Sequence, residues 1–407
     1  MNILVLNCGS SSIKYQLYKM ANSREDHVLA SGMVERIGEK DAAITHQDGG
    51  KRTRRTLDVP DHRHAFQIIV TALTDPEAGV ISDISEVNAI GHRVVHGGER
   101  FVDSCLIDDD VIAAIEDCVP LAPLHNPANL IGIRAAEDLL SEVPQVAVFD
   151  TSFHETMEPR AYLYAIPQEY HDDHRVRRYG FHGTSHRYVA GVAAEMLGKA
   201  AEGANVITAH LGNGCSITAV RGGKSVDTSM GMTPLEGLVM GTRCGDIDAA
   251  VVFHLARNLD MDYDEIDRLL NTQSGLLGLS GVSNDMREII AAAEAGDKKA
   301  ALAIEVFCYR LKKYIGAYTA VLGEVDALVF TGGIGENAEL IRRLACTGLA
   351  PLGYEIDEGK NAATHGTAAD ISTEKSRARV LVIPTNEEVI IARDTARIVM
   401  AKVAQPQ

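Results

Sequence analysis

NILVLNCGSSSIKYQLYKM, residues 2–20, joins an apolar strand to an alternating strand through a turn of small polar residues. We expect the strands at Ile3 to Leu6 and at Ile13 to Tyr18. Such a turn leaves backbone N–H groups and hydroxyls free to surround phosphate oxygens, and Lys14 adds a cation just after it. The stretch therefore predicts a phosphate-binding hairpin. An ordinary Ser/Gly turn is the alternative that these residues alone leave open.

A weaker copy of this pattern, HLGNGCSITAV, occupies His210 to Val220. It again places a turn of Asn, Gly and small residues between two strands. Two phosphate turns in two parts of the chain predict a duplicated fold with a nucleotide held between the halves. The segment that follows contains GGKS at Gly222 to Ser225 and resembles the end of a P-loop. Thr218 stands where a P-loop requires glycine, so we interpret this segment as a hairpin turn.

A third glycine cluster, TGGIGEN at Thr331 to Asn337, follows the apolar strand Ala327 to Phe330, and we expect a helix to begin at Ala338. A glycine turn between strand and helix lets a ligand approach the helix N-terminus. The spacing Gly-x-Gly-x-x-Ala also fits a dinucleotide fingerprint, with Glu355 or Asp357 as the ribose carboxylate. An NAD-dependent dehydrogenase is therefore an open alternative, although it leaves the two hairpins unexplained.

Composition and charge exclude several classes of protein. With 407 residues, 46% of them hydrophobic and 23% charged, the chain can fold into two or three globular domains. No run approaches the roughly 18–20 apolar residues of a membrane span, and we expect a soluble cytoplasmic protein without a membrane partner. A net charge of −17 argues against binding to nucleic acid. The seven cysteines form no CxxC pair, which suits a reducing compartment.

Strands and helices alternate along the chain, as is typical of an α/β protein. We expect the clearest helical region at Asp285 to Leu322, interrupted around Ala295 to Asp297. Residues 38–60 and 359–379 are polar and weakly patterned, so we expect surface hairpins or loops there. The other expected strands are Ala89–Ile90 continuing into Arg93–Val95, Gln145–Phe149, Asn205–Ala209, Ser216–Val220 and Val380–Ile383.

Nine motif-like blocks are spread over nearly the whole chain. They are NCGSSSIK (7–14), GHRVVHGGE (91–99), PLAPLHNP (120–127), VFDTSFH (148–154), RRYGFHGTSH (177–186), HLGNG (210–214), DTSMGMTPLEGLVMGTRCGD (227–246), TGGIGEN (331–337) and IPTNEE (383–388). These blocks, in family order, resemble acetate kinases. The resemblance implies the acetate/propionate kinase family of the actin-like and sugar-kinase ATPase superfamily.

The resemblance implies an α/β fold of two related actin-like, ribonuclease H-like domains around a central cleft. The N-terminal domain would comprise residues 1–150 and recover 384–407, and residues 151–383 would form the nucleotide-binding domain. It also implies a homodimer, which no residue pattern indicates by itself.

The reaction implied is ATP + acetate ⇌ ADP + acetyl phosphate with Mg²⁺, for which Mn²⁺ can substitute. By the same resemblance Glu387 is a metal ligand, although the adjacent Glu388 fits as well. The implied residues are Asp150, His182 and Arg243 for catalysis; Arg93, Val95, His125 and Pro234 for substrate; Asn7 and Glu387 for the metal; and Lys14, His210, Leu211, Gly212, Asn213, Gly214, Asp285, Met286, Arg287, Gly333, Ile334, Gly335, Glu336 and Asn337 for the nucleotide.

These residue types suit phosphoryl transfer, which needs alignment and stabilisation of charge. The planar guanidinium groups of Arg93 and Arg243 can grip a carboxylate or a phosphoryl group with two hydrogen bonds, although most arginines serve in surface ion pairs. His182 and His186 could instead form a metal site, but no HExxH pattern accompanies them. Two arginines and a histidine around one group favour direct in-line transfer over a covalent phospho-enzyme.

Asp150 follows the carboxyl end of an expected strand, where a carboxylate would project into a cleft. Because acetate is already ionised at pH 7, we hypothesise that Asp150 positions magnesium more than it moves protons. Val95 stands where propionate-preferring relatives tend to carry a smaller residue, so we expect acetate to be preferred over propionate by about 1–3 kcal/mol. A propionate kinase is the nearest alternative. An ATPase of the actin or chaperone type would not need Arg93 or Arg243.

Overall fold

The computed structural model describes residues 1–22, 26–123 and 125–404. The chain divides into two compact units, Met1–Phe153 with Asn386–Gln407, and His154–Thr385. No helix among these described residues has the length and apolar character that a membrane crossing requires. The predicted domain boundaries and the cleft between the domains stay predictions. Residues 23–25, 124 and 405–407 of the first predicted domain lie outside the described residues.

The first unit is built on an eight-stranded sheet in the order β5-β4-β3-β2-β1-β6-β8-β7 among its described residues. Strands β1, β6 and β8 are parallel, and β2 and β3 continue the sheet in antiparallel fashion. The elements are β1 Asn2–Cys8, β2 Ser12–Met20, β3 Asp26–Glu35, β4 Ala43–Asp48, β5 Lys51–Thr56, α1 His62–Leu73, β6 Val87–Val94, β7 Cys105–Leu106, α2 Asp109–Asp117, α3 Asn126–Leu139, β8 Gln145–Phe149 and α15 Glu387–Ala404.

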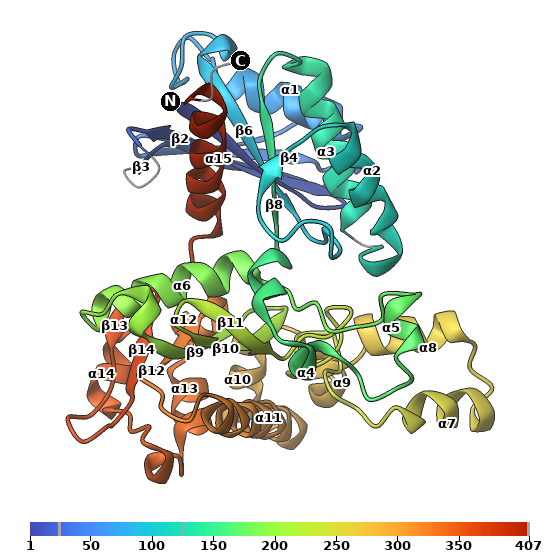
Figure 1. Ribbon diagram of the computed structural model, residues 1–407, viewed down its shortest axis with the longest axis vertical. Helices are drawn as coiled ribbons and strands as arrows, with labels where there is room; N and C mark the ends of the chain where they lie inside the picture. The colour runs from blue at the N-terminus through green and yellow to red at the C-terminus, as the bar shows by residue number, and fades with distance from the viewer. Residues whose placement is uncertain (23–25, 124, 405–407) are drawn as a thin grey trace. The chain divides into compact units, whose positions relative to one another are not determined.

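Helices cover both faces of this sheet (Figure 1). Ile90 of β6 belongs to the core under α1 and α3. The next residue, Gly91, faces α15, because a Cβ there would lie 2.4 Å from Thr395 Oγ1. Successive strand residues point to opposite faces, so α15 and the pair α1 and α3 lie on opposite sides.

The second unit contains a six-stranded sheet in the order β11-β10-β9-β12-β14-β13 among its described residues. Its β9, β12 and β14 are parallel, whereas β10 and β11 are antiparallel. The elements are α4 Pro159–Tyr162, α5 Glu169–Asp172, α6 Gly183–Met196, β9 Asn205–Leu211, β10 Cys215–Arg221, β11 Lys224–Thr228, α7 Ala250–Asn258, α8 Tyr263–Thr272, α9 Gly275–Ser280, α10 Met286–Glu294, α11 Lys298–Leu322, β12 Ala327–Thr331, α12 Gly332–Asn337, α13 Glu339–Cys346, α14 Glu358–Ala363, β13 Ala369–Asp370 and β14 Arg379–Val382.

The two sheets repeat one arrangement. In each, an antiparallel three-strand meander is followed by two further parallel strands, in the order third, second, first, fourth, fifth. The α/β class and the related cores expected from the two hairpins are therefore confirmed. The predicted strands and the interrupted helix agree with the structure, since α10 ends at Glu294 and α11 begins at Lys298.

The helix expected from Ala338 is confirmed, because Ala338 is the N-cap of α13. Two other local predictions were wrong. The glycine turn expected at Thr331 to Asn337 is instead the short helix α12, which ends before Ala338, where φ is −96° and ψ is 88°. Residues 359–379 are not only loop, because they contain most of α14 and the edge strand β13. The side chain of Asp357 caps α14 by accepting a hydrogen bond from Lys360 N.

The predicted hairpin turn at Gly222 and Gly223 is confirmed. Both glycines have positive φ, +57° and +76°, and they join β10 to β11 with no helix following. Positive φ at both central residues is the conformation that tight two-residue hairpins require.

Candidate active site

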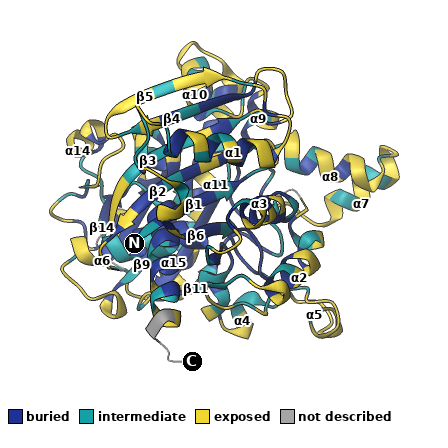
Figure 2. Cartoon of the chain, turned by 90° about the horizontal axis from the view of Figure 1, so that it is seen from above, coloured by how far each residue is buried: buried dark blue, intermediate teal, exposed yellow. Residues whose placement is uncertain are grey.

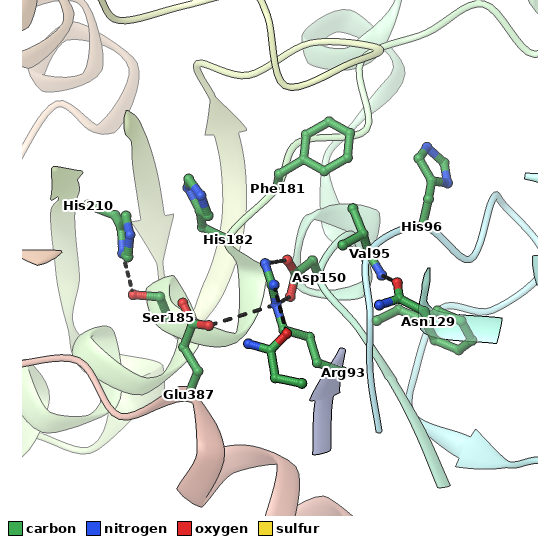
Figure 3. A network of polar contacts seen from close by, with 12 residues as sticks. Arg93, Val95, His96, Asn129, Asp150, Phe181, His182, Ser185, His210 and Glu387 are labelled. Atoms are coloured by element: carbon green, nitrogen blue, oxygen red, sulfur yellow. Dashed lines mark hydrogen bonds and ion pairs between the residues drawn. The ribbon is translucent and has the colours of Figure 1, made fainter. Parts of the chain in front are cut away.

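An arginine and a carboxylate meet at the carboxyl end of the first sheet. Arg93 is carried by β6 and Asp150 follows the neighbouring parallel strand β8, so the sheet brings them together. Arg93 donates two hydrogen bonds, from Nη2 to Asp150 Oδ2 at 2.5 Å and from Nε to Oδ1 at 3.1 Å (Figure 3). Asp150 is only 1% exposed. The buried carboxylate therefore fixes the plane of the guanidinium.

Two other predicted residues complete this cluster. Arg93 Nη1 donates to Asn7 Oδ1 at 3.3 Å, and Glu387 Oε2 lies 3.8 Å from Arg93 Nε. Lys14 forms an ion pair with Glu388 rather than with Glu387. The sequence-predicted residues Asn7, Arg93, Asp150 and Glu387 thus lie together within one unit.

The cluster carries more negative than positive charge. Burial raises the pKa of Glu387 to about 7; Arg93 opposes this rise, whereas Asp150 adds to it. Burial disfavours the charged form of Arg93, but Asp150 and Glu387 together hold its pKa above the ordinary value. The three acidic side chains of Asp150, Glu387 and Glu388 thus lie beside only two cationic ones, Arg93 and Lys14. Such a site favours an added cation.

Two buried asparagines, which the sequence analysis did not identify, shape the chain beside Arg93. Asn129 of α3 accepts a hydrogen bond from Val95 N at 3.1 Å and donates one to Cys8 O at 2.9 Å. Asn126 accepts from His96 N at 3.1 Å. Val95 is buried at 3% exposure. The predicted residue His125 is the N-cap of the same helix.

His182 lies in the second unit at a strained position. It is the N-cap of α6 and has a left-handed backbone with φ of 57°. Its Nδ1 is 2.9 Å from Ser216 Oγ, and its ring stacks on His210 with centroids 4.3 Å apart. A non-glycine residue at positive φ is uncommon and is found at functional sites.

Arg243 lies against the same turn as His182. A Cβ on Gly214 would be 2.9 Å from Arg243 Nη2 and 3.3 Å from the ring of His182, so both side chains lie against this glycine. Arg243 Nη1 donates to Pro234 O at 2.6 Å. Burial lowers the pKa of Arg243. Among the described residues no carboxylate lies within ion-pair distance of Arg243, which leaves its charge available to an anion.

The predicted nucleotide segments surround the turn at Gly212 to Gly214. Asn213 Oδ1 accepts a hydrogen bond from Asn284 Nδ2 at 3.0 Å, which brings the segment before Asp285 to this turn. Asp285 caps α10 by accepting from Arg287 N at 2.9 Å. The side chains of Leu211 and Met286 are buried in the core, so they can offer a ligand only their backbone.

The glycine cluster after β12 packs on the end of β9. Gly332 has φ of +75°, and a Cβ there would lie 2.7 Å from Leu211 O. Glu336 Oε1 accepts hydrogen bonds from Gly332 N at 2.9 Å and from Thr385 N at 3.1 Å. Because the glycines lie inside a helix and Asp357 is used as a helix cap, the dinucleotide fingerprint has little structural support.

Comparison with known proteins gives one consistent result. A model of the acetokinase family matches residues 2–393. An acetate kinase of Methanosarcina thermophila is 55% identical over 404 residues, covering 99% of this chain and 98% of that protein. The crystal structure of Porphyromonas gingivalis acetate kinase has a TM-score of 0.92 at 47% identity and covers 98% and 99% of the two chains. That of a propionate kinase from Francisella tularensis subsp. tularensis has a TM-score of 0.90 at 46% identity, with coverage of 98% and 99%.

Proposed function

Because the chain belongs to the acetokinase family, we propose that it transfers the γ-phosphoryl group of ATP to acetate, giving acetyl phosphate and ADP, and that it catalyses the reverse reaction. The observation that carries the proposal is Arg243, a cation without a carboxylate partner among the described residues, beside His182 and the turn at Gly212 to Gly214. Such a group stabilises the charge of a transferring phosphoryl group.

We assign Arg243, His182 and Asp150 to catalysis. Acetate arrives ionised, so no strong base is needed. A direct in-line transfer then requires only that acetate and the γ-phosphoryl group be aligned and their charge stabilised, with Arg93 and Arg243 as the guanidinium groups. Asp150 supports this by holding Arg93 through two hydrogen bonds.

We propose Mg²⁺ as the metal, with Mn²⁺ able to replace it, held by Asn7 and Glu387. The donors fit, since an amide oxygen and a carboxylate are oxygen ligands and the surrounding cluster has an excess of negative charge. When bound, the ion would neutralise phosphate charge. Asp150 would position it directly or through water, and Asp150→Asn should therefore weaken the dependence of the rate on Mg²⁺; an unchanged Mg²⁺ dependence together with a lost pH-dependent step would contradict this role.

The nucleotide would contact Lys14, the turn at His210 to Gly214, Asp285 to Arg287, and Gly333 to Asn337. Support comes from Asn284, which ties the second and third of these segments together in one unit. The methyl group of acetate would contact Val95 and Pro234, with His125 nearby. Val95 is buried and held at its backbone by Asn129, which favours a pocket of fixed size and a preference for acetate over propionate.

We also propose a homodimer formed through α7 and α8. No residue of α7 is buried (Figure 2). Three large apolar side chains are strongly exposed in α7, α8 and the link between them: Phe253 at 54%, Leu259 at 61% and Tyr263 at 78%. Exposed apolar side chains gathered in this way mark an interaction surface. Sedimentation should give a dimer that Phe253→Asp dissociates. Val102→Asp, at another exposed valine, is the control, and a monomeric wild type would refute the proposal.

All seven cysteines, each among the described residues, are free thiols. On that ground we propose a cytoplasmic location, because reducing compartments keep thiols unpaired.

The function is tested by trapping acyl phosphate with hydroxylamine after incubation with ATP and Mg²⁺, using acetate, propionate and butyrate separately. We expect a strong signal with acetate, a weaker one with propionate and none without Mg²⁺. Arg243→Leu should abolish the signal, whereas Arg343→Leu, at an exposed arginine of the same unit, is the matched control. ATP binding without acyl phosphate from any carboxylate would refute the proposed function.

A further inference from the structure

A chain of hydrogen bonds runs from the buried side of the second sheet to His182. Thr208 Oγ1 lies 2.7 Å from His186 Nδ1, and His186 Nε2 lies 2.7 Å from Ser216 Oγ. Ser216 Oγ is in turn 2.9 Å from His182 Nδ1. Thr208, Ser216 and His186 are all fully buried, at 0% exposure. This row of hydrogen bonds therefore links His182 to groups that water does not reach.

The fold brings these four residues into line. Thr208 lies on β9 and Ser216 on the neighbouring strand β10, opposite His210. Thr208 and His210 are two residues apart on one strand, so they share a face with Ser216. His182 and His186 lie four residues apart at the start of α6, which packs over that face, and Ser216 thus lies between the two rings.

Proton counting decides which way the hydrogen bonds point. Each hydroxyl has one proton, and His186 is neutral because burial lowers its pKa well below the ordinary value. In one arrangement Thr208 donates to His186 Nδ1, His186 Nε2–H donates to Ser216, and Ser216 donates to His182 Nδ1. Every proton in that arrangement has an acceptor.

The reverse arrangement leaves a proton without a partner. If His182 Nδ1–H donated to Ser216, Ser216 would donate to His186 Nε2, and His186 Nδ1–H would donate to Thr208. The Thr208 hydroxyl proton would then be buried with no acceptor, because Thr208 Oγ1 has no other hydrogen-bond partner among the described residues. A buried donor without an acceptor is destabilising. A protonated His182 would likewise leave one buried hydroxyl proton, that of Thr208 or of Ser216, without an acceptor among the described residues.

We propose that Thr208, His186 and Ser216 are positioning residues that hold His182 as the neutral tautomer with its proton on Nε2. The proposal rests on the proposed function, in which His182 acts on the transferring phosphoryl group. Phosphoryl oxygens accept hydrogen bonds, so a proton fixed on Nε2 gives His182 a donor without a rearrangement during the reaction. The stacked ring of His210, whose Nδ1 is bound to Ser185 at 2.8 Å, limits rotation of His182.

The first test observes the tautomer directly in the wild-type chain. The full-length protein is labelled with ¹⁵N-histidine, and nitrogen–proton correlation spectra are recorded at neutral pH. The His182 signals are assigned by their loss in His182→Gln. We expect a proton on Nε2 and none on Nδ1. A proton on Nδ1, alone or with one on Nε2, would overturn the proposal.

The second test separates a positioning role from a structural one. Thr208→Val keeps the shape of the side chain and removes the hydroxyl, so we expect a mixture of His182 tautomers and a kcat lowered by about tenfold, the value of one buried hydrogen bond. The KM for acetate should change by less than about twofold. Thr208→Ser should restore the wild-type spectrum and kcat.

Thr218→Val is the matched control. It removes a buried hydroxyl from the neighbouring strand β10. Thr218 is hydrogen-bonded to Thr228 at 2.8 Å and takes no part in the hydrogen bonds that lead to His182. We expect it to lower stability and leave the His182 spectrum unchanged. A wild-type spectrum in Thr208→Val would refute the positioning role. Absence of acetyl phosphate formation by the wild type would instead refute the proposed function, since the spectrum is read independently of activity.

Discussion

Arg342, a fully buried arginine on α13, should be indispensable to the nucleotide segment. At 0% exposure it donates all five of its N–H groups. The acceptors are Gly335 O and Glu336 O of α12, and Asn361 Oδ1, Asn361 O and Thr364 O at the end of α14, at 2.7–3.0 Å. The carbonyls at the ends of helices lack partners within the helix and carry partial negative charge. One guanidinium therefore satisfies the ends of two helices at once.

Arg342→Lys is the informative change because it retains the positive charge. Burial lowers the pKa of Arg342 to about 10, so the native side chain is charged at pH 7. Lysine has three donors on one atom. At least two buried acceptors would lose their partners, and at about 1–3 kcal/mol each this lowers the free energy of unfolding by roughly 2–6 kcal/mol. For a unit of this size, 4 kcal/mol corresponds to a melting temperature lower by roughly 8–16 °C.

The assay is thermal unfolding monitored by circular dichroism, with the KM for ATP measured at a temperature where the variant is folded. We expect a lower melting temperature and a raised KM for ATP with the KM for acetate little changed. Arg343→Lys, the next residue on the same helix and exposed to solvent, is the control. If Arg342→Lys has the same melting temperature as the wild type, the five hydrogen bonds do not stabilise α12 and the reasoning is refuted.

Three further predictions follow from individual side chains. Val95→Ala should raise the ratio of kcat/KM for propionate to that for acetate by at least about tenfold, measured by acyl phosphate trapping, and an unchanged ratio would exclude Val95 from the acyl pocket. Burial lowers the pKa of His92 and of His154 to about 4, so the unfolded chain binds more protons between pH 6.5 and 4. The free energy of unfolding from urea titrations should therefore fall with decreasing pH across that window, by up to about 3 kcal/mol for each residue; a flat profile would contradict burial of both neutral rings. Gly332→Ala should cost about 1–3 kcal/mol of stability, because its φ is positive and its Cβ would strike a backbone carbonyl, whereas Gly333→Ala, with open space around it, should not.

Strands were predictable from the sequence because apolar runs are bounded by turn residues. Gln145–Phe149 is β8 to the residue, and Asn205–Ala209 falls two residues short of β9. Local pattern failed at the glycine cluster after β12. The α12 segment is rich in glycine, which disfavours helix. It is nevertheless helical because the Glu336 carboxylate and Arg342 satisfy its two ends. Both contacts are made by polar side chains, which the pattern of apolar residues used to predict helices does not take into account.

The same limit applies to the site. Arg93 and Asp150 were recognisable because each stands at the end of an apolar strand within a distinctive motif. Asn129, Ser216 and Arg342 were not, since each has at least one hydrogen-bond partner 19 or more residues away. For Asn129 a signal did exist: a polar residue on the apolar face of a helix, three positions after Asn126, indicates buried hydrogen bonding. Ser216 offers no such signal, because serine is common in strands that follow a turn.

The duplicated hairpins explain how one architecture serves two kinds of chemistry. In the first unit, Asn7 and Lys14 are the second cross-strand pair counted back from the turn. In the second unit the same place is taken by His210 and Ser216. Directly opposed residues have side chains on one face of the sheet, a few ångströms apart. The first pair adds an amide oxygen and a cation to a carboxylate cluster, and the second pair holds His182 by stacking and by a hydrogen bond. Exchanging the two pairs, with both sheets intact, should therefore abolish activity while preserving folding. A conserved fold with lost phosphoryl transfer would place the division of labour in these four side chains, whereas retained activity would place it elsewhere in the strands.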